Sequence, residues 1–203
     1  MSISPPAKTR VRRTPESSRD NILSAAEALL VEQGPQALKL VDVAARAGVA
    51  TATVLHHFGS IDGVQSALME RMIEQLVEAI LAAPEQGAAS PAPPLAAVQA
   101  LFDVFETRGA ARLAAWLELS GEAKRLTTVR TAVQNVAARR IARSGVSAER
   151  AEDLVLISVV VAMGAGLFGR SLAEMIGKPP ERTRELAMEL LYAQAQRIAV
   201  GGG

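Results

Sequence analysis

The apolar residues of this 203-residue chain recur three or four positions apart, and no stretch alternates between apolar and polar in the manner of a strand. Residues 17–33 follow this helical spacing. The helix is expected to end at Gly34-Pro35, because glycine suits the left-handed position after a helix and proline cannot continue one. Two short helices are predicted next, at about 40–47 and 51–57.

A longer helix is predicted from Ser60, which suits an N-cap, to Pro84. The segment 84–94 (PEQGAASPAPP) is rich in Pro, Ala and Gly, and we interpret it as a linker. Everything beyond the linker follows helical spacing, in segments at 94–107, 109–120, 122–143, 147–177 and 180–199. The pattern therefore predicts an all-α fold.

The composition supports this fold class. Hydrophobic residues make up 49% of the chain but aromatic residues only 3%, so the core must be built mainly from Ala, Leu, Val and Ile. An alanine-rich composition of this kind favours helices.

The net charge of the whole chain does not indicate a nucleic-acid partner, but the N-terminal segment is basic. The net charge is +1, whereas the first nineteen residues carry five basic side chains against Glu16, a local charge of +4. Residues 1–16 are predicted to be a disordered arm, with the first helix capped by Ser17 or Ser18. Such an arm either attracts DNA phosphates, with Arg12 and Arg13 as candidates, or is a solvated tail.

Cysteine usage and apolar runs bear on localisation. The chain has no cysteine and shows no secretory signal at its N-terminus, which favours the cytoplasm. Its longest uncharged stretch, 154–169, has sixteen residues and three glycines. A membrane span needs about 20 apolar residues. The stretch is therefore predicted to be a buried helix, and no membrane partner is expected.

Residues 39–58 (KLVDVAARAGVATATVLHHF) carry the pattern of a helix-turn-helix, in which the second helix enters the DNA major groove. Gly48 supplies the conformational freedom of the turn. The inward-facing positions are apolar: Val43, Ala44, Ala47, Val49, Val54 and Phe58. The positions left to point outward from the second helix are Thr51, Thr53 and His56.

With this motif the chain resembles the TetR family of bacterial repressors, specifically over about residues 18–64 and in architecture over the rest. The resemblance implies a three-helix DNA-binding domain at 17–60 and a helical effector-binding and dimerisation domain at 61–200. The last two long helices would make the dimer. The matching residues are Asp42-Val43-Ala44, Ala47-Gly48-Val49, Thr53-Val54 and His57-Phe58-Gly59-Ser60.

Several positions depart from the family pattern. Ala50 stands where a Ser commonly caps the recognition helix, and Leu55 where a Tyr commonly contacts a DNA phosphate. Ile61 replaces a common Lys, and Lys39 a common Thr. Each lost polar contact removes on the order of 1 kcal/mol. These departures affect DNA affinity and operator sequence more than the fold.

The predicted DNA contacts lie on the recognition helix, beside it and in the arm: Lys39, Ala50, Thr51, Thr53, His56, His57, Arg12 and Arg13. His57 is interpreted as a packing or phosphate-contacting residue. His56 and His57 are adjacent, so they diverge on a helix and cannot share a metal ion. No metal or cofactor is expected, and no catalytic motif is found, so the chain is not expected to be an enzyme.

Five large apolar residues are candidates for an effector pocket, with plain core packing as the alternative for each: Phe102, Phe105, Trp116, Met163 and Phe168. The apolar, glycine-containing stretch 159–166 indicates close helix crossing, room for a ligand or tight packing within one chain. A dimer interface with the 180–199 helix is favoured. Its candidate residues are Val160, Gly164, Leu186, Leu190 and Leu191.

The predicted function is that of a homodimeric repressor, released from a palindromic operator by a small apolar or amphipathic ligand. Its expected partners are double-stranded DNA, the effector and a second copy of the chain. One alternative is a helical small-molecule-binding protein with weakened or lost DNA binding, which Ala50 and Leu55 favour. Another is an enzyme built in a helical bundle, which the lack of an acid–base or metal cluster disfavours.

Overall fold

The computed structural model describes residues 14–82, 95–121 and 147–200, together with Thr131, Gln134 and Ala138. Within these ranges the elements are helices and none is a strand, which confirms the all-α fold class. The arm residues Arg12 and Arg13 and the linker 84–94 lie outside the described residues. So does the predicted helix at 122–143, apart from the three single positions.

Four helices form the N-terminal part: α1 (Pro15–Gln33), α2 (Leu40–Ala47), α3 (Thr51–Phe58) and α4 (Ile61–Ala82). The predicted serine N-cap of α1 is wrong, because the hydroxyl of Thr14 accepts the hydrogen bond from the Ser17 N–H at 3.2 Å. The helix can begin at Pro15 since a first-turn residue needs no N–H. Ser60 caps α4 as predicted, its Oγ lying 3.0 Å from the Gly63 nitrogen.

The remaining described helices are α5 (Leu95–Phe102), α6 (Ala110–Leu119), α8 (Ala148–Gly164), α9 (Arg170–Met175) and α10 (Arg182–Val200). Two π-helical segments were not predicted. Asp103–Thr107 extends α5, and Ala165–Gly169 joins α8 and α9 into one continuous helix. A Cβ on Gly166 would lie 2.7 Å from the Phe105 carbonyl oxygen, so the two π-helical segments cross at a distance that only glycine allows.

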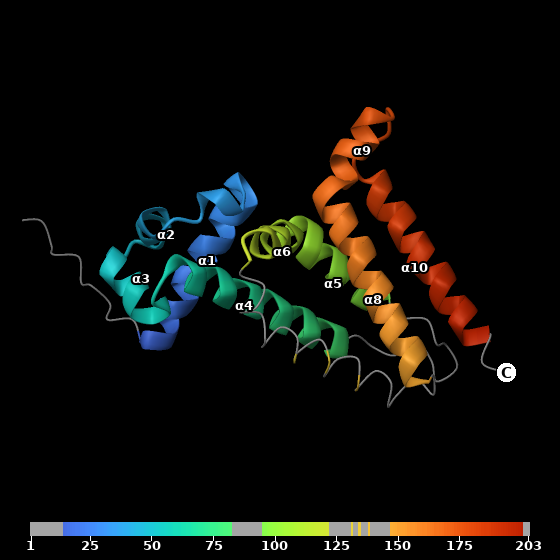
Figure 1. The fold of residues 1–203 in the computed structure, drawn as a ribbon, viewed down its shortest axis with the longest axis horizontal. Coiled ribbons are helices and arrows are strands. Elements are labelled where there is room, and N and C mark those ends of the chain that lie inside the picture. The colour runs from blue at the N-terminus through green and yellow to red at the C-terminus, as the bar shows by residue number, and fades with distance from the viewer. Residues whose placement is uncertain are drawn as a thin grey trace, which may run out of the picture.

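Figure 1 shows the arrangement of these helices. The short helices α2 and α3 gather with α1 at one end, while α8 and α10 run side by side at the other. Between the two ends lie α4, α5 and α6. One buried apolar cluster runs through the molecule, from Ile22 of α1 through Leu68 and Phe102 to Leu191 of α10. The helix-turn-helix therefore shares its apolar core with the helices that follow it in the chain.

The prediction that 154–169 is a buried helix is wrong for the single chain. The continuous helix Ala148–Met175 is the only helix of the described ranges that is long and apolar enough to cross a membrane by length and composition, and only 12% of its apolar window is buried. Its exposed large apolar residues are Leu156, Ile157, Val160, Phe168, Leu172 and Met175. Spacing alone could not reveal this, because an apolar helix face has the same pattern inside a chain and between two chains.

Candidate nucleic-acid interface

The turn between α2 and α3 depends on the backbone of Gly48. This residue has φ 67° and ψ 35°, in the left-handed region that side chains other than glycine rarely adopt. The Val49 N–H then donates to the Ala44 carbonyl at 3.0 Å. Among the described residues, no atom lies within 4 Å of a Cβ built on Gly48, so its backbone conformation, rather than space, requires glycine here.

The inner faces of α2 and α3 pack as predicted. Val43, Ala44 and Val54 are buried. One contact was missed: the Asn21 side chain on α1 donates from Nδ2 to the Ala47 carbonyl at 2.7 Å. This bond satisfies a carbonyl at the end of α2 and holds the turn against α1. No local pattern could have revealed it, because the two residues are 26 positions apart.

The end of α3 is fixed against both neighbouring helices. A Cβ on Gly63 of α4 would lie 2.0 Å from the Phe58 carbonyl oxygen, so the first turn of α4 sits directly on the end of α3. On the other side, the Arg19 guanidinium of α1 lies 4.6 Å from the centre of the Phe58 ring, a cation–π contact. The recognition helix is thus held in place by α1, α2 and α4.

The outward face of α3 differs in part from the prediction. Ala52, Leu55 and His56 are its exposed residues, and Leu55 is 41% exposed. Thr51 and Thr53 are only partly exposed and flank this face. His57 is also partly buried, and its ring lies 6.1 Å from that of Phe58.

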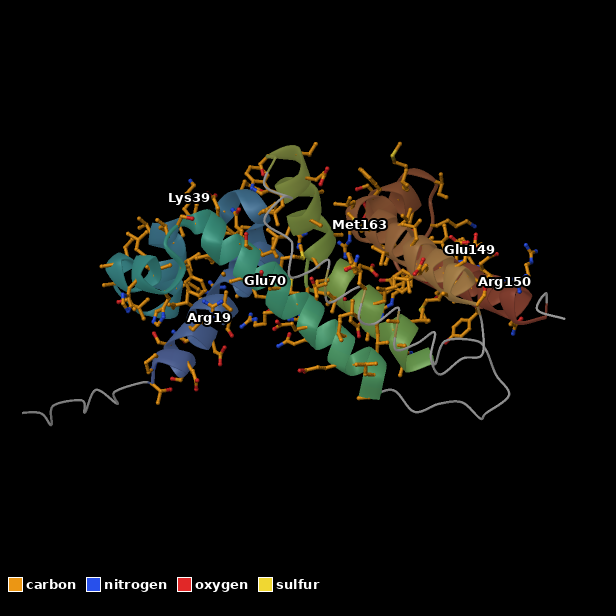
Figure 2. All side chains as sticks on the ribbon, turned by 60° about the horizontal axis from the view of Figure 1, so that its bottom comes forward. Arg19, Lys39, Glu70, Glu149, Arg150 and Met163 are labelled. Atoms are coloured by element: carbon orange, nitrogen blue, oxygen red, sulfur yellow. The ribbon has the colours of Figure 1, made fainter. Side chains whose placement is uncertain are left out.

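The N-termini of both short helices lack side-chain caps. Ala50 and Lys39 occupy the two N-cap positions and make no capping hydrogen bond. The Lys39 side chain is exposed, and Figure 2 shows it at the same end of the molecule as Arg19, away from Glu149 and Arg150 on α8. Two exposed positive side chains therefore lie at the end of the molecule that carries α3, and backbone N–H groups without side-chain caps begin both helices.

The carboxylate of Glu27 links α1 to α4 and to the residues that follow α5. Glu27 of α1 accepts hydrogen bonds from Arg71 of α4 and from Arg108, which follows the π-helical end of α5, each at 2.6 Å. Arg108 also donates to Gln75 at 2.6 Å, and Arg112 of α6 donates to the Val31 carbonyl at 3.2 Å. This Glu27 junction was not predicted, because its members are 33 to 81 positions apart.

The five predicted effector residues differ in how far they are buried. Phe102 and Phe105 are buried, and Met163 packs against the same core, near the middle of the molecule (Figure 2). Trp116 and Phe168 are instead 40% and 60% exposed. The Arg184 guanidinium lies 5.8 Å from the centre of the Phe102 ring. The nearby Glu106 Oε2 is buried and has no hydrogen bond within the part of the chain that the structure describes; it lies 3.9 Å from Arg184.

Four of the predicted interface residues lie on exposed surface: Val160, Gly164, Leu186 and Leu190. Leu191 does not, since it is 1% exposed and belongs to the core of the single chain. The helical register explains the difference, because Leu190 and Leu191 are about 100° apart around α10.

Comparisons with known proteins agree with this geometry. Residues 22–68 match the sequence profile of the family described as bacterial regulatory proteins, tetR family. No curated protein sequence matches the chain.

Solved structures of regulators share the fold over nearly the whole chain. A transcriptional regulator from Rhodococcus sp. Rha1 is 20% identical, with a TM-score of 0.63 over 91% of this chain and 97% of its own. A TetR transcriptional regulator from Legionella pneumophila is 16% identical, with a TM-score of 0.63 over 90% and 97%. The multidrug binding protein EbrR complexed with ethidium is 20% identical, with a TM-score of 0.58 over 87% and 98%.

The profile match covers α2, α3 and the Gly48 turn, together with most of α1 and the start of α4. The helices that follow have the arrangement of the solved regulators. Residues 22–68 thus match the tetR family of bacterial regulatory proteins, and the chain has the fold of solved regulators of this kind.

Proposed function

We propose that the protein is a homodimeric repressor that binds a palindromic operator through α3 and is released by a small apolar or amphipathic ligand. The observation that carries the proposal is the exposed face of α3, held by α1, α2 and α4 at the end of the molecule that also carries the exposed side chains of Lys39 and Arg19. An exposed helix with positive charge beside it suits the major groove and its phosphates.

The dimer is supported by the apolar surface of α8 and α10. Val160 is 56% exposed, and Leu186 and Leu190 lie on the neighbouring helix. Gly164 has open space where a Cβ would be, so a partner helix can approach closely there. Burying this surface against its own copy removes apolar area from water and sets two recognition helices about 34 Å apart, or a multiple of that distance.

The ligand is proposed to bind against Phe102, Phe105 and Met163, in the part of the chain between the dimer helices and α4. The EbrR structures contain ethidium, proflavin or imidazole, which are compatible with an aromatic lining of this kind. Ethidium should raise the melting temperature of the protein, measured without DNA because the dye also binds duplexes. If ethidium, proflavin and a panel of neutral apolar compounds all leave the melting temperature unchanged, the result would count against the proposed ligand site.

DNA binding is tested by a mobility shift with duplexes selected from a randomised pool. Lys39→Ala should weaken binding to all sequences and lower the slope of log K against log salt by about 1. Lys178→Ala is the matched control, because this exposed lysine lies between α9 and α10, far from α3. The selected sequence should be an inverted repeat.

The alternative, a small-molecule-binding protein with weakened or lost DNA binding, is favoured by Ala50 and Leu55. Ala50 leaves α3 without a side-chain cap. If no duplex is selected at low salt while a ligand still raises the melting temperature, the alternative replaces the repressor.

A further inference from the structure

The recognition helix carries an unusual set of groups for reading DNA. Its sequence, TATVLHHF, contains no Arg, Lys, Asn, Gln, Asp or Glu. The bidentate pairings of Arg or Lys with guanine and of Asn or Gln with adenine are therefore absent from α3. Hydroxyl, imidazole and apolar groups are all that remain on this helix to distinguish one base pair from another.

The exposed part of α3 is mainly apolar. Ala52, Leu55 and His56 fall within an arc of about 100° around the helix axis, and the buried Val54 points away from them. Leu55 is 41% exposed and does not belong to the apolar core cluster, so part of its side chain is open to a partner. The face that meets the groove thus offers one methyl group, one isobutyl group and one imidazole.

The major groove presents one apolar group, the C5-methyl of thymine. We propose that Ala52 and Leu55 read thymine methyl groups, so that each operator half-site carries thymines opposite these two residues, with His56 supplying the polar contact beside them. This inference rests on the proposed DNA-binding function and specifies which base that surface selects. A leucine side chain cannot hydrogen-bond a phosphate, so a contact of Leu55 with the DNA backbone would remove water from the phosphate without replacing its hydrogen bonds.

The test replaces thymine by deoxyuridine, which lacks only the methyl group, one position at a time in the selected duplex. Wild-type protein should lose about fourfold in affinity at each thymine that Leu55 or Ala52 contacts. Leu55→Ala should bind the thymine duplex more weakly and lose the sensitivity at the Leu55 position while keeping it at the Ala52 position. Leu119→Ala, at an exposed leucine of α6, is the matched control and should keep the full wild-type response.

The outcomes separate this inference from the proposed function. Specific binding with equal affinity for thymine and deoxyuridine at every position would overturn the methyl-reading role and leave the DNA-binding function intact. A Leu55→Ala protein with unchanged deoxyuridine sensitivity at every position would overturn the assignment to Leu55. The absence of any selected duplex would instead contradict DNA binding itself.

Discussion

Single side chains decide how the DNA-binding helices are attached to the rest of the chain. At the Glu27 junction, burial acts to raise the pKa of the Glu27 carboxyl, but the hydrogen bonds and charges of Arg108 and Arg71 outweigh it. The pKa of Glu27 is therefore lowered from its ordinary value of 4.5. A lowered pKa means that this carboxylate stabilises the fold while it is ionised.

Glu27→Gln should lower the free energy of unfolding at neutral pH by about 1–3 kcal/mol, because it removes the negative charge and replaces one of the two accepting oxygens by an NH2 group that faces a guanidinium. The folded pKa lies below the unfolded one, so this contribution is fully present above about pH 4.5 and is lost as the pH falls through the folded pKa. Urea unfolding of both proteins between neutral and acid pH measures the difference.

The matched control for this prediction is Glu32→Gln, which removes the more exposed ion pair of Glu32 with Arg46 between α1 and α2. Exposed pairs contribute about 0–1 kcal/mol. Equal losses in the two variants would contradict a special role for Glu27.

Gly48→Ala should destabilise the protein by about 1–2 kcal/mol, the cost of placing a Cβ in the left-handed region. The space around Gly48 is open, so the cost arises from the backbone alone. Gly48→Asn should recover part of the loss, because asparagine tolerates this conformation better. Thermal unfolding ranks the stability of the three proteins. An alanine variant as stable as the wild type would refute the requirement for glycine at position 48.

Residues of the turn were predictable because they act through local rules. Gly48 and Ser60 were identified from the sequence, since a turn glycine and an N-cap are recognised from their immediate neighbours. Asn21 and Glu27 were not, because the groups that they contact lie far away along the chain.

At the scale of the element, the helices follow from periodicity but their crossings do not. The helices α5 and α8 were predicted, yet each continues into a π-helical segment at the place where the two segments meet. The crossing depends on Gly166, whose missing side chain accommodates the Phe105 carbonyl and Ala111. Two segments about 60 positions apart in the sequence determine this geometry together, so neither segment reveals it alone.

Gly166→Ala should lower the melting temperature by several degrees, because its Cβ would lie 2.9 Å from the Ala111 Cβ and closer still to the Phe105 carbonyl oxygen. Overpacking of this kind costs about 1–3 kcal/mol, or roughly 2–4 °C per kcal/mol for a chain of this size. Gly164→Ala, two positions earlier in open space, is the control and should not lower the stability of the single chain. Circular dichroism melts compare the two at low concentration; equal melting temperatures would contradict the tight crossing.

At the scale of the whole molecule, the apolar surface of α8 and α10 is a feature that the sequence predicts only in part. The spacing of 154–169 predicted a helix correctly, but assigned its apolar face to the interior of the chain. Val160 and Leu190, two of the residues predicted for a dimer interface, lie on the surface of α8 and α10. Because α10 lies beside α8, some of the apolar residues on these helices are covered within the single chain. Leu191 is one of the covered residues.

Val160→Glu should convert the proposed dimer into a monomer, because a charge buried without a partner costs about 3 kcal/mol or more, at least a hundredfold in the dimer dissociation constant. Sedimentation equilibrium at micromolar concentration gives the mass. Leu119→Glu, at an exposed leucine outside the proposed interface, should leave the mass unchanged. A monomeric wild type, or a dimeric Val160→Glu protein, would exclude this interface.

The contact between Gly63 and Phe58 makes α4 a lever arm for the recognition helix. A helix of 22 residues is about 33 Å long. Because its first turn rests on the last carbonyl of α3 with no room for a Cβ, α3 must follow that end of α4. A tilt of about 5° around the Ala82 end displaces the Gly63 end by about 3 Å, the length of one hydrogen bond. In the proposed repressor, a ligand would thus need only a small rotation of α4 to move α3 out of register with the bases.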